Sequence, residues 1–221
     1  MKNKKIYTFL MLFLLFIFCI STKSHASNNE PSITSGSAIL LENSTSKVLF
    51  EKNMNEKLEP ASITKIMTAI LAIENCNLDD VVTVPYEAIS NIPSGYSVAP
   101  LQTDEQITVD QLLRVLMVHS ANDAANALAY HIDGSIPAFA ERMNAKLNAL
   151  GLKDSHFTNP SGQHDTNHYS TAHDIAILLQ YCMKNTTFKT YASLKSCQLS
   201  ATNKSEERSF QNTNPMLQPN S

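Results

Sequence analysis

The chain has 221 residues with a formal net charge of −3, and 43% of its residues are hydrophobic. This hydrophobic content is typical of a folded protein and excludes an intrinsically disordered one. The sequence contains no basic cluster and no aromatic ladder, so nothing in it indicates binding to nucleic acid.

The N-terminal segment has the layout of a secretory signal. Lysines at positions 2, 4 and 5 precede an almost wholly apolar run over 6–20, and Ser24-His25-Ala26 offers small residues for signal peptidase. The run is short for a membrane-spanning helix, although an uncleaved anchor is the alternative. We therefore expect residues 1–26 to be a signal peptide and the protein to act outside the cytoplasm. The remaining 195 residues would carry a formal charge of −7, because the segment holds four lysines and no acid.

Residues 27–36 are polar and predict a flexible leader, and residues 37–221 form the predicted main domain. Strands are expected over 37–42 and 47–52, around a turn. Pro60 ends a loop. From Ser62 to Ile73 apolar residues recur with helical spacing, and 81–84 predicts a short strand.

Helices dominate the rest of the pattern. Thr108–Gln111 is a capping box that opens a helix, and a second helix follows Asn122. A third runs from Pro137 to Leu150, with Gly151 suited to the left-handed position that ends it. Thr171 to Asp174 opens another, the signal weakens after Met183, and 203–221 have no periodicity. This order predicts an α+β fold in which helices pack on a mainly antiparallel sheet that is incomplete within the chain.

Three cysteines follow the predicted signal peptide: Cys76, Cys182 and Cys197. An odd number outside the cytoplasm argues against a disulfide framework. We expect buried, unpaired thiols, with one disulfide pair as the alternative.

Ser62 and Lys65 are the first candidates for chemistry. Their spacing places the lysine one helical turn beyond the serine, on the same face. A serine hydroxyl becomes a good nucleophile only when a base removes its proton, and a lysine whose pKa is lowered by burial can serve as that base. The N–H groups at the helix start would stabilise developing negative charge. The alternative is an ordinary N-cap serine beside a surface lysine.

His119-Ser-Ala-Asn-Asp123 is the second candidate motif, between two predicted helices. Ser120 could relay a proton to a leaving group, and Asn122 could hold a substrate amide through both its donor and its acceptor. Either residue could instead simply cap the next helix. The combination of S-x-x-K with a later S-x-N is far more specific than either motif alone.

The chain resembles the serine D-Ala-D-Ala carboxypeptidases, the low-molecular-mass penicillin-binding proteins of peptidase family S11. The resemblance is carried by "ASITKIMTA", "HSANDAANALA" and "GLKDSHFTNPSGQHDTNHYSTAHDIA", and it covers nearly all of the chain beyond the signal. It implies that Ser62 is the acylated nucleophile, Lys65 its proton acceptor, Ser120 a proton relay and Asn122 a substrate contact. The implied reaction removes the terminal D-alanine of a peptidoglycan pentapeptide, penicillins would acylate the same serine, and no cofactor is implied.

The family's third motif, Lys-Thr-Gly, does not occur in the 221 residues. "NTNPML", over 212–217, resembles the segment that precedes it, and Lys189-Thr190-Tyr191 has tyrosine in place of the glycine. We therefore expect the chain to be a piece of a longer protein. A molecule that ended at Ser221 is predicted to have little or no activity. Membrane anchoring stays open.

Two other functions are alternatives. A class A β-lactamase would carry a glutamate in an E-x-x-L-N motif, whereas the nearest string here begins with Asn144, inside a predicted helix. The second alternative is an inactive binding protein on the same fold. The missing third motif favours this alternative, whereas the retention of all four site residues argues against it.

Four histidines between His156 and His173 match no common zinc pattern, and we expect them to make local hydrogen bonds.

Overall fold

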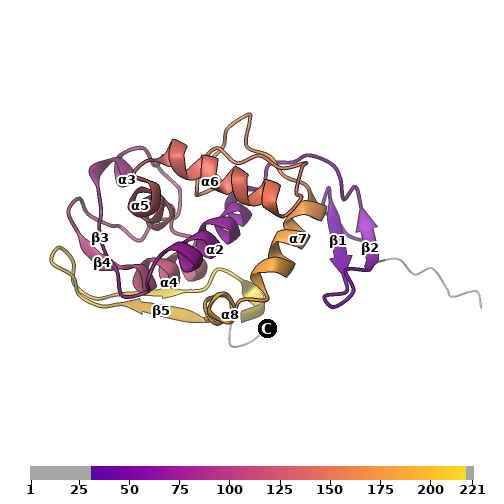
Figure 1. Ribbon diagram of the computed structural model, residues 1–221. Coiled ribbons are helices and arrows are strands. Elements are labelled where there is room, and N and C mark those ends of the chain that lie inside the picture. The colour runs from indigo at the N-terminus through magenta and orange to yellow at the C-terminus, as the bar shows by residue number, and fades with distance from the viewer. Residues whose placement is uncertain (1–30, 218–221) are drawn as a thin grey trace, which may run out of the picture. The chain divides into compact units, whose positions relative to one another are not determined.

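The computed structural model in Figure 1 describes residues 31–217, so the predicted signal peptide and residues 27–30 of the predicted leader lie outside the described residues. The chain divides into two units, Met1–Thr34 and Ser35–Ser221. Residues 31–34 of the first unit contain no helix or strand, and every element below belongs to the second.

The N-terminal hairpin was predicted from the sequence and is present. Strands β1 (Ala38–Leu41) and β2 (Val48–Lys52) pair antiparallel, with Ala38 opposite Lys52 and an irregularity between Leu40 and Leu41. The chain then runs through a loop to a 3₁₀ turn, η1 (Ala61–Thr64), which leads directly into helix α2 (Lys65–Asn75).

Helices α4 (Val109–His119), α5 (Asn122–Asp133) and α6 (Ile136–Ala149) were predicted from the sequence, and together with α2 they form the core. Helix α5 contacts all three of the others. Its first eight residues, NDAANALA, are all buried, and the small side chains of the four alanines let neighbouring helices approach closely. The predicted capping box at Thr108 is formed, and Gly151 has the expected positive φ of 76°. The core therefore holds the end of α4 and the start of α5 rigidly.

The remaining elements surround this core (Figure 1). Strand β3 (Val81–Thr83) was predicted, and so was helix α7 (Ala172–Cys182), which Thr171 caps. Five short elements were not predicted: α3 (Tyr86–Ser90), β4 (Gln106–Thr108), α8 (Thr186–Ala192), β5 (Ser196–Leu199) and β6 (Arg208–Gln211). A second 3₁₀ turn, η2 (Pro215–Leu217), follows.

The α+β class is confirmed, but the sheet differs from the prediction. Within residues 31–217 the strands form three separate antiparallel pairs, β1–β2, β3–β4 and β5–β6, instead of one layer. In the same residues no helix is both long and apolar enough to cross a membrane.

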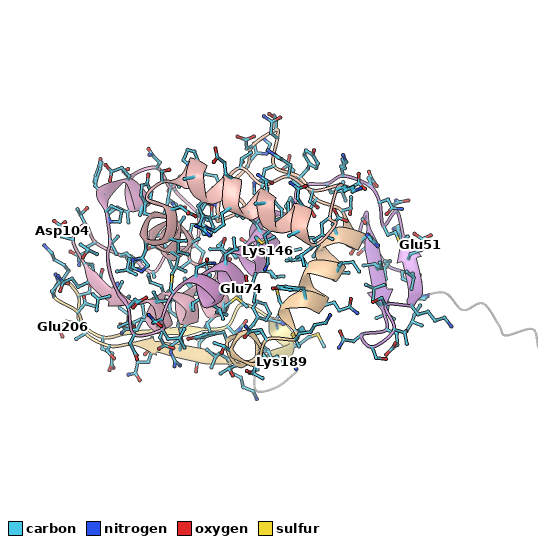
Figure 2. All side chains as sticks on the ribbon, in the orientation of Figure 1. Glu51, Glu74, Asp104, Lys146, Lys189 and Glu206 are labelled. Atoms are coloured by element: carbon cyan, nitrogen blue, oxygen red, sulfur yellow. The ribbon has the colours of Figure 1, made fainter. Side chains whose placement is uncertain are left out.

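The three cysteines are unpaired, with Cys182 and Cys197 buried and Cys76 half-buried, in agreement with the prediction of free thiols. Polar contacts instead tie the helices together. Lys146 of α6 donates hydrogen bonds to Glu74 of α2 and to the hydroxyl of Tyr181 in α7. Figure 2 shows Glu74 and Lys146 close to each other in the middle of the molecule. This contact joins three helices, one of which begins at Lys65.

Candidate active site

Ser62 lies in a strained turn at the entrance to α2. The sequence predicted an α-helix from Ser62, whereas Ser62 belongs to the 3₁₀ turn η1 and the α-helix begins at Lys65. Ala61, directly before Ser62, has a φ of +46°, which is unfavourable for any residue with a Cβ. Ser62 is exposed to solvent, whereas Lys65 is only 3% exposed. The turn therefore presents a hydroxyl to solvent directly above a buried amine.

Lys65 is positioned by two contacts. Its Nζ lies 3.1 Å from Oγ of Ser62 and 2.8 Å from the carbonyl oxygen of Ser161. Burial lowers the pKa of Lys65 from 10.5 to about 8, against an opposing effect of the Asp123 charge. In the neutral form the amine can donate N–H to the Ser161 carbonyl while its lone pair accepts the Ser62 proton. The spacing noted in the sequence thus brings the Ser62 hydroxyl and the Lys65 amine into contact.

Ser120 lies at the corner between α4 and α5. It ends α4 with a left-handed backbone, φ 59° and ψ 35°, and Ala121 is extended before α5 begins at Asn122. Glycine is usual at such a position, so a serine there is unusual. Ser120 lines a pocket of about 370 Å³ together with Ser62 and Lys65. The residues predicted from two distant motifs therefore share one cavity.

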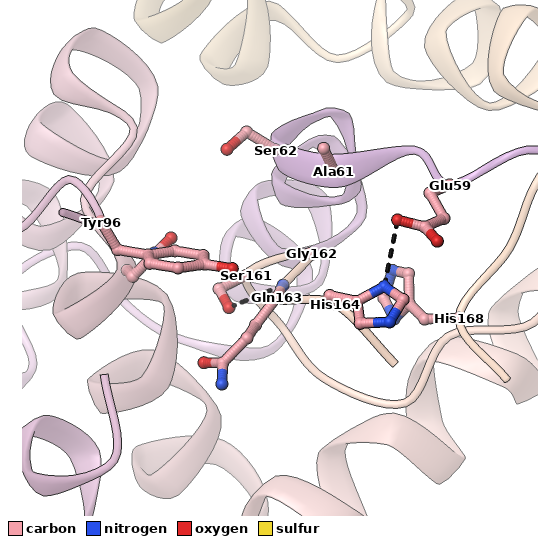
Figure 3. Close-up of a pocket in the computed structure, with 10 residues that line it drawn as sticks. Glu59, Ala61, Ser62, Tyr96, Ser161, Gly162, Gln163, His164 and His168 are labelled. Atoms are coloured by element: carbon pink, nitrogen blue, oxygen red, sulfur yellow. Dashed lines mark hydrogen bonds and ion pairs between the residues drawn. The ribbon is translucent and has the colours of Figure 1, made fainter. Parts of the chain in front are cut away.

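Asn122 lines a second pocket next to Ser62. Its side chain is 4% exposed, and its Oδ1 atom is one of only two buried side-chain polar atoms within residues 31–217 that have no hydrogen-bond partner. Ser62 and Asn122 both line this pocket of about 180 Å³, shown in Figure 3, where an ion pair between Glu59 and His164 lies at the rim. An acceptor that is buried beside a cavity without a donor suits a ligand N–H group.

The site also uses a segment that sequence reasoning did not place there, the strap, defined as residues 158–168. Asn159 organises it, because its Oδ1 accepts hydrogen bonds from the backbone N–H groups of Ser161, Gly162 and Gln163. Gly162 has a φ of +80°, and a Cβ there would lie 1.8 Å from the carbonyl oxygen of Ala61. The turn signal Asn-Pro-Ser-Gly at 159–162 could have predicted the bend, but not its close approach to Ala61.

The histidines agree only in part with the expectation of local hydrogen bonds. His156 and His173 bond nearby groups, the carbonyl of Asn167 and the carboxylate of Asp174. His164 instead pairs with Glu59. His168 accepts locally from the N–H of Thr158 but also lies 2.8 Å from Oγ1 of Thr64, a residue 104 positions earlier. Within residues 31–217 no three histidine, cysteine or acidic side chains are grouped to hold a metal ion.

A loop from Tyr96 to Leu101 forms another wall of the site. The Asp123 carboxylate accepts hydrogen bonds from the N–H groups of Ala99 and Leu101, and Asn122 N–H donates to the carbonyl of Ser97. Figure 3 shows the Tyr96 ring beside Ser161 and Gln163. Desolvation raises the pKa of Asp123, although its N–H partners oppose that shift. The residue after the Ser-Ala-Asn motif therefore holds this wall in place.

Two look-alike motifs have structural roles. Lys189-Thr190-Tyr191 lies in helix α8, where the Tyr191 hydroxyl donates to Asp110, so it is not a strand beside the site. Asn144 lies inside α6 and exchanges hydrogen bonds with the backbone of Phe157. Neither string therefore supplies a motif to the site.

Comparison with known proteins identifies the family of the chain. The model of the D-alanyl-D-alanine carboxypeptidase family S11 matches residues 24–221. D-alanyl-D-alanine carboxypeptidase DacF of Bacillus subtilis is 41% identical over 153 residues, which are 67% of this chain and 39% of that protein. DacA of Haemophilus influenzae is 36% identical over 154 residues, with the same coverage of 67% and 39%. The chain thus spans about two fifths of the length of these curated relatives.

Solved structures show the same fold. Penicillin-binding protein 6B from Escherichia coli superposes with a TM-score of 0.79 at 31% identity, covering 89% of this chain and 63% of that one. A variant of the Streptomyces K15 DD-transpeptidase gives a TM-score of 0.81 at 30% identity, with coverage of 87% and 79%. The family match covers far more than half of the chain, and the fold agrees with it. The chain therefore belongs to the D-alanyl-D-alanine carboxypeptidase family, peptidase family S11.

Proposed function

We propose that the protein is a serine-type D-Ala-D-Ala carboxypeptidase that removes the terminal D-alanine of peptidoglycan pentapeptides through an acyl-enzyme on Ser62. The observation that carries the proposal is the contact of 3.1 Å between Oγ of Ser62 and Nζ of Lys65, an amine that burial makes a usable base near neutral pH. Family membership and the names of the relatives support the same reaction.

Acylation would begin with proton transfer from Ser62 to the neutral amine of Lys65. The Ser62 oxygen bonds to the carbonyl carbon of the penultimate D-alanine, and the resulting tetrahedral intermediate then loses the C–N bond to the terminal residue. The departing amine needs a proton, and the Ser120 hydroxyl, in the same pocket as Lys65, is the candidate relay.

Deacylation would reverse the same proton path with water as the nucleophile. Water adds to the ester carbonyl, the C–O bond to Ser62 breaks, and the serine oxygen regains its proton. The orphaned Oδ1 of Asn122 is suited to accept an N–H of the peptide, which would hold the acyl group beside Ser62 throughout. β-Lactam antibiotics, which contain an acylatable amide, would react at the same serine.

The place of action follows from the substrate. Peptidoglycan lies outside the cytoplasmic membrane, and the sequence of residues 1–26 has the layout of a secretory signal. We therefore place the activity outside the cytoplasm, in cell-wall biogenesis. Mass determination of the N-terminus of the protein recovered from cells would test cleavage after Ala26.

A fluorescent penicillin tests the proposal. The protein is expressed from its natural reading frame, incubated with the label and digested, and the labelled peptide is identified by mass spectrometry. We expect one adduct, on Ser62, that is absent from Ser62→Ala, together with D-alanine release from a pentapeptide. Rapid hydrolysis of the penicillin without a lasting adduct would favour a β-lactamase. Complete absence of label would favour an inactive binding protein.

A further inference from the structure

The strap is held against the start of α2 by three side chains from one face of the chain between residues 64 and 68. Thr64 contacts His168, Lys65 donates to the carbonyl of Ser161, and Thr68 donates to the carbonyl of Pro160. All three side chains are at most 3% exposed. The Ser161 carbonyl, which binds the Lys65 amine, is therefore positioned by contacts of the strap on both sides of it, at Pro160 and at His168.

His168 is the one side chain of the strap that reaches back to this face. It is 3% exposed, and its ring stacks on Phe157 with centroids 5.1 Å apart. The backbone N–H of Thr158 donates to its Nδ1 atom at 3.1 Å, so Nδ1 is the acceptor and the ring proton lies on Nε2. Nε2–H consequently donates to Oγ1 of Thr64.

We propose that His168 is a positioning residue, which through its hydrogen bond to Thr64 fixes the strap so that the Ser161 carbonyl holds the Lys65 amine against Ser62. The inference rests on the proposed acylation of Ser62 with Lys65 as base. His168 also lines the pocket of about 180 Å³ that contains Ser62, but its two ring nitrogens contact Thr64 and Thr158, and it takes no part in proton transfer. Its burial keeps it neutral, with a pKa lowered to about 4, so the bond to Thr64 persists across the working pH range.

Breaking this bond has a consequence that a loss of stability alone would not have. A loosened strap lets water reach Lys65, so that the pKa of its amine rises from about 8 towards its ordinary value of 10.5. Each unit of increase reduces the neutral amine at pH 7 tenfold. The pH at which acylation is half-maximal should therefore move upward.

The test compares two substitutions at the same position. His168→Asn keeps an acceptor near the Thr158 N–H but is too short to reach Thr64, whereas His168→Gln can place an N–H donor near the former Nε2 position. The second-order rate constant for acylation by a fluorescent penicillin is measured between pH 6 and 10 for both variants. His131→Asn, an exposed histidine at the end of α5, is the control.

We expect His168→Asn to raise the pH of half-maximal acylation, the midpoint, by about one unit and to lower the acylation rate constant at pH 7 roughly tenfold. His168→Gln should stay nearer the parent midpoint, and His131→Asn should match the parent. Thr64→Val, of almost the same shape, removes the bond from the other side and should reproduce the shift, whereas Thr64→Ser keeps the hydroxyl.

Circular dichroism and thermal melting identify variants that do not fold. An unchanged midpoint in a folded His168→Asn or Thr64→Val protein overturns the inference, even if the maximal rate falls. Failure of both variants to fold also overturns it, because the bond would then serve stability alone. Ser62→Ala separates this question from the proposed function: label retained in Ser62→Ala contradicts the acyl-enzyme, whatever the His168 variants do.

Discussion

Nζ of Lys65 lies 2.8 Å from the carbonyl oxygen of Ser161, a residue 96 positions later in the chain. The second contact of the same amine is Oγ of Ser62, at 3.1 Å. One partner is fixed by helical spacing and the other by tertiary packing. Their combination places a buried amine where it can exchange a proton with an exposed serine.

The pH dependence of acylation follows from the pKa of Lys65. Burial lowers that pKa from 10.5 to about 8, and only the neutral amine can accept the Ser62 proton. The rate constant for acylation should therefore rise about tenfold per pH unit below pH 7.5 and level off above about pH 9. Stopped-flow measurements with a fluorescent penicillin would show this curve. A flat profile would exclude Lys65 as the base, and Lys65→Arg, which stays charged, should lower the rate at least 100-fold.

Gly162 should tolerate no side chain. A Cβ there would lie 1.8 Å from the carbonyl oxygen of Ala61, and its φ is +80°. We expect Gly162→Ala to lower the free energy of unfolding by roughly 2–4 kcal/mol and to slow acylation of the neighbouring Ser62. Gly134→Ala is the matched control, because Gly134 has a φ of +73° but nothing within 4 Å of a Cβ. It should cost about 1 kcal/mol in urea denaturation. Equal losses of stability in the two variants would contradict the close approach of Gly162 to Ala61.

Ser120 should show a trade-off between function and stability. Its φ of 59° is unfavourable for serine, and glycine adopts this conformation without a Cβ penalty. We expect Ser120→Gly to leave the free energy of unfolding unchanged or to raise it by up to about 1 kcal/mol. Acylation should fall by roughly 10²–10⁴, because the hydroxyl is lost. Ser120→Ala should lose the same activity without the gain in stability. Full activity in either variant would remove Ser120 from the proton path.

Asp123 should be essential for stability because of its backbone partners. Its carboxylate is 2% exposed and accepts from the N–H groups of Ala99 and Leu101. Asp123→Asn replaces one acceptor oxygen with a donor that faces a backbone N–H. We expect a loss of roughly 2–4 kcal/mol in the free energy of unfolding, measured by urea denaturation. Asp79→Asn, at an exposed position, should change it by less than about 0.5 kcal/mol. If Asp123→Asn lost as little stability as Asp79→Asn, the loop from Tyr96 to Leu101 would not depend on the Asp123 carboxylate.

Elements with local signals were predicted well from the sequence. The capping box at Thr108, the Thr171 cap and the left-handed Gly151 each depend on residues within one turn of one another. Strands β4, β5 and β6 were missed because they carry too little local signal. In β5 only Cys197 and Leu199 face inward, and two inward residues are too few to distinguish a strand from a loop.

By itself the sequence identified the candidate site residues, since a serine and a lysine three positions apart lie on the same face of a helical turn. It also determined the family, because its motifs are read along the chain. Only the tertiary structure decided how deeply Lys65 is buried, that Ser161 binds its amine and that His168 reaches Thr64. Contacts between residues some hundred positions apart depend on how all the intervening helices pack, and no local pattern encodes that packing.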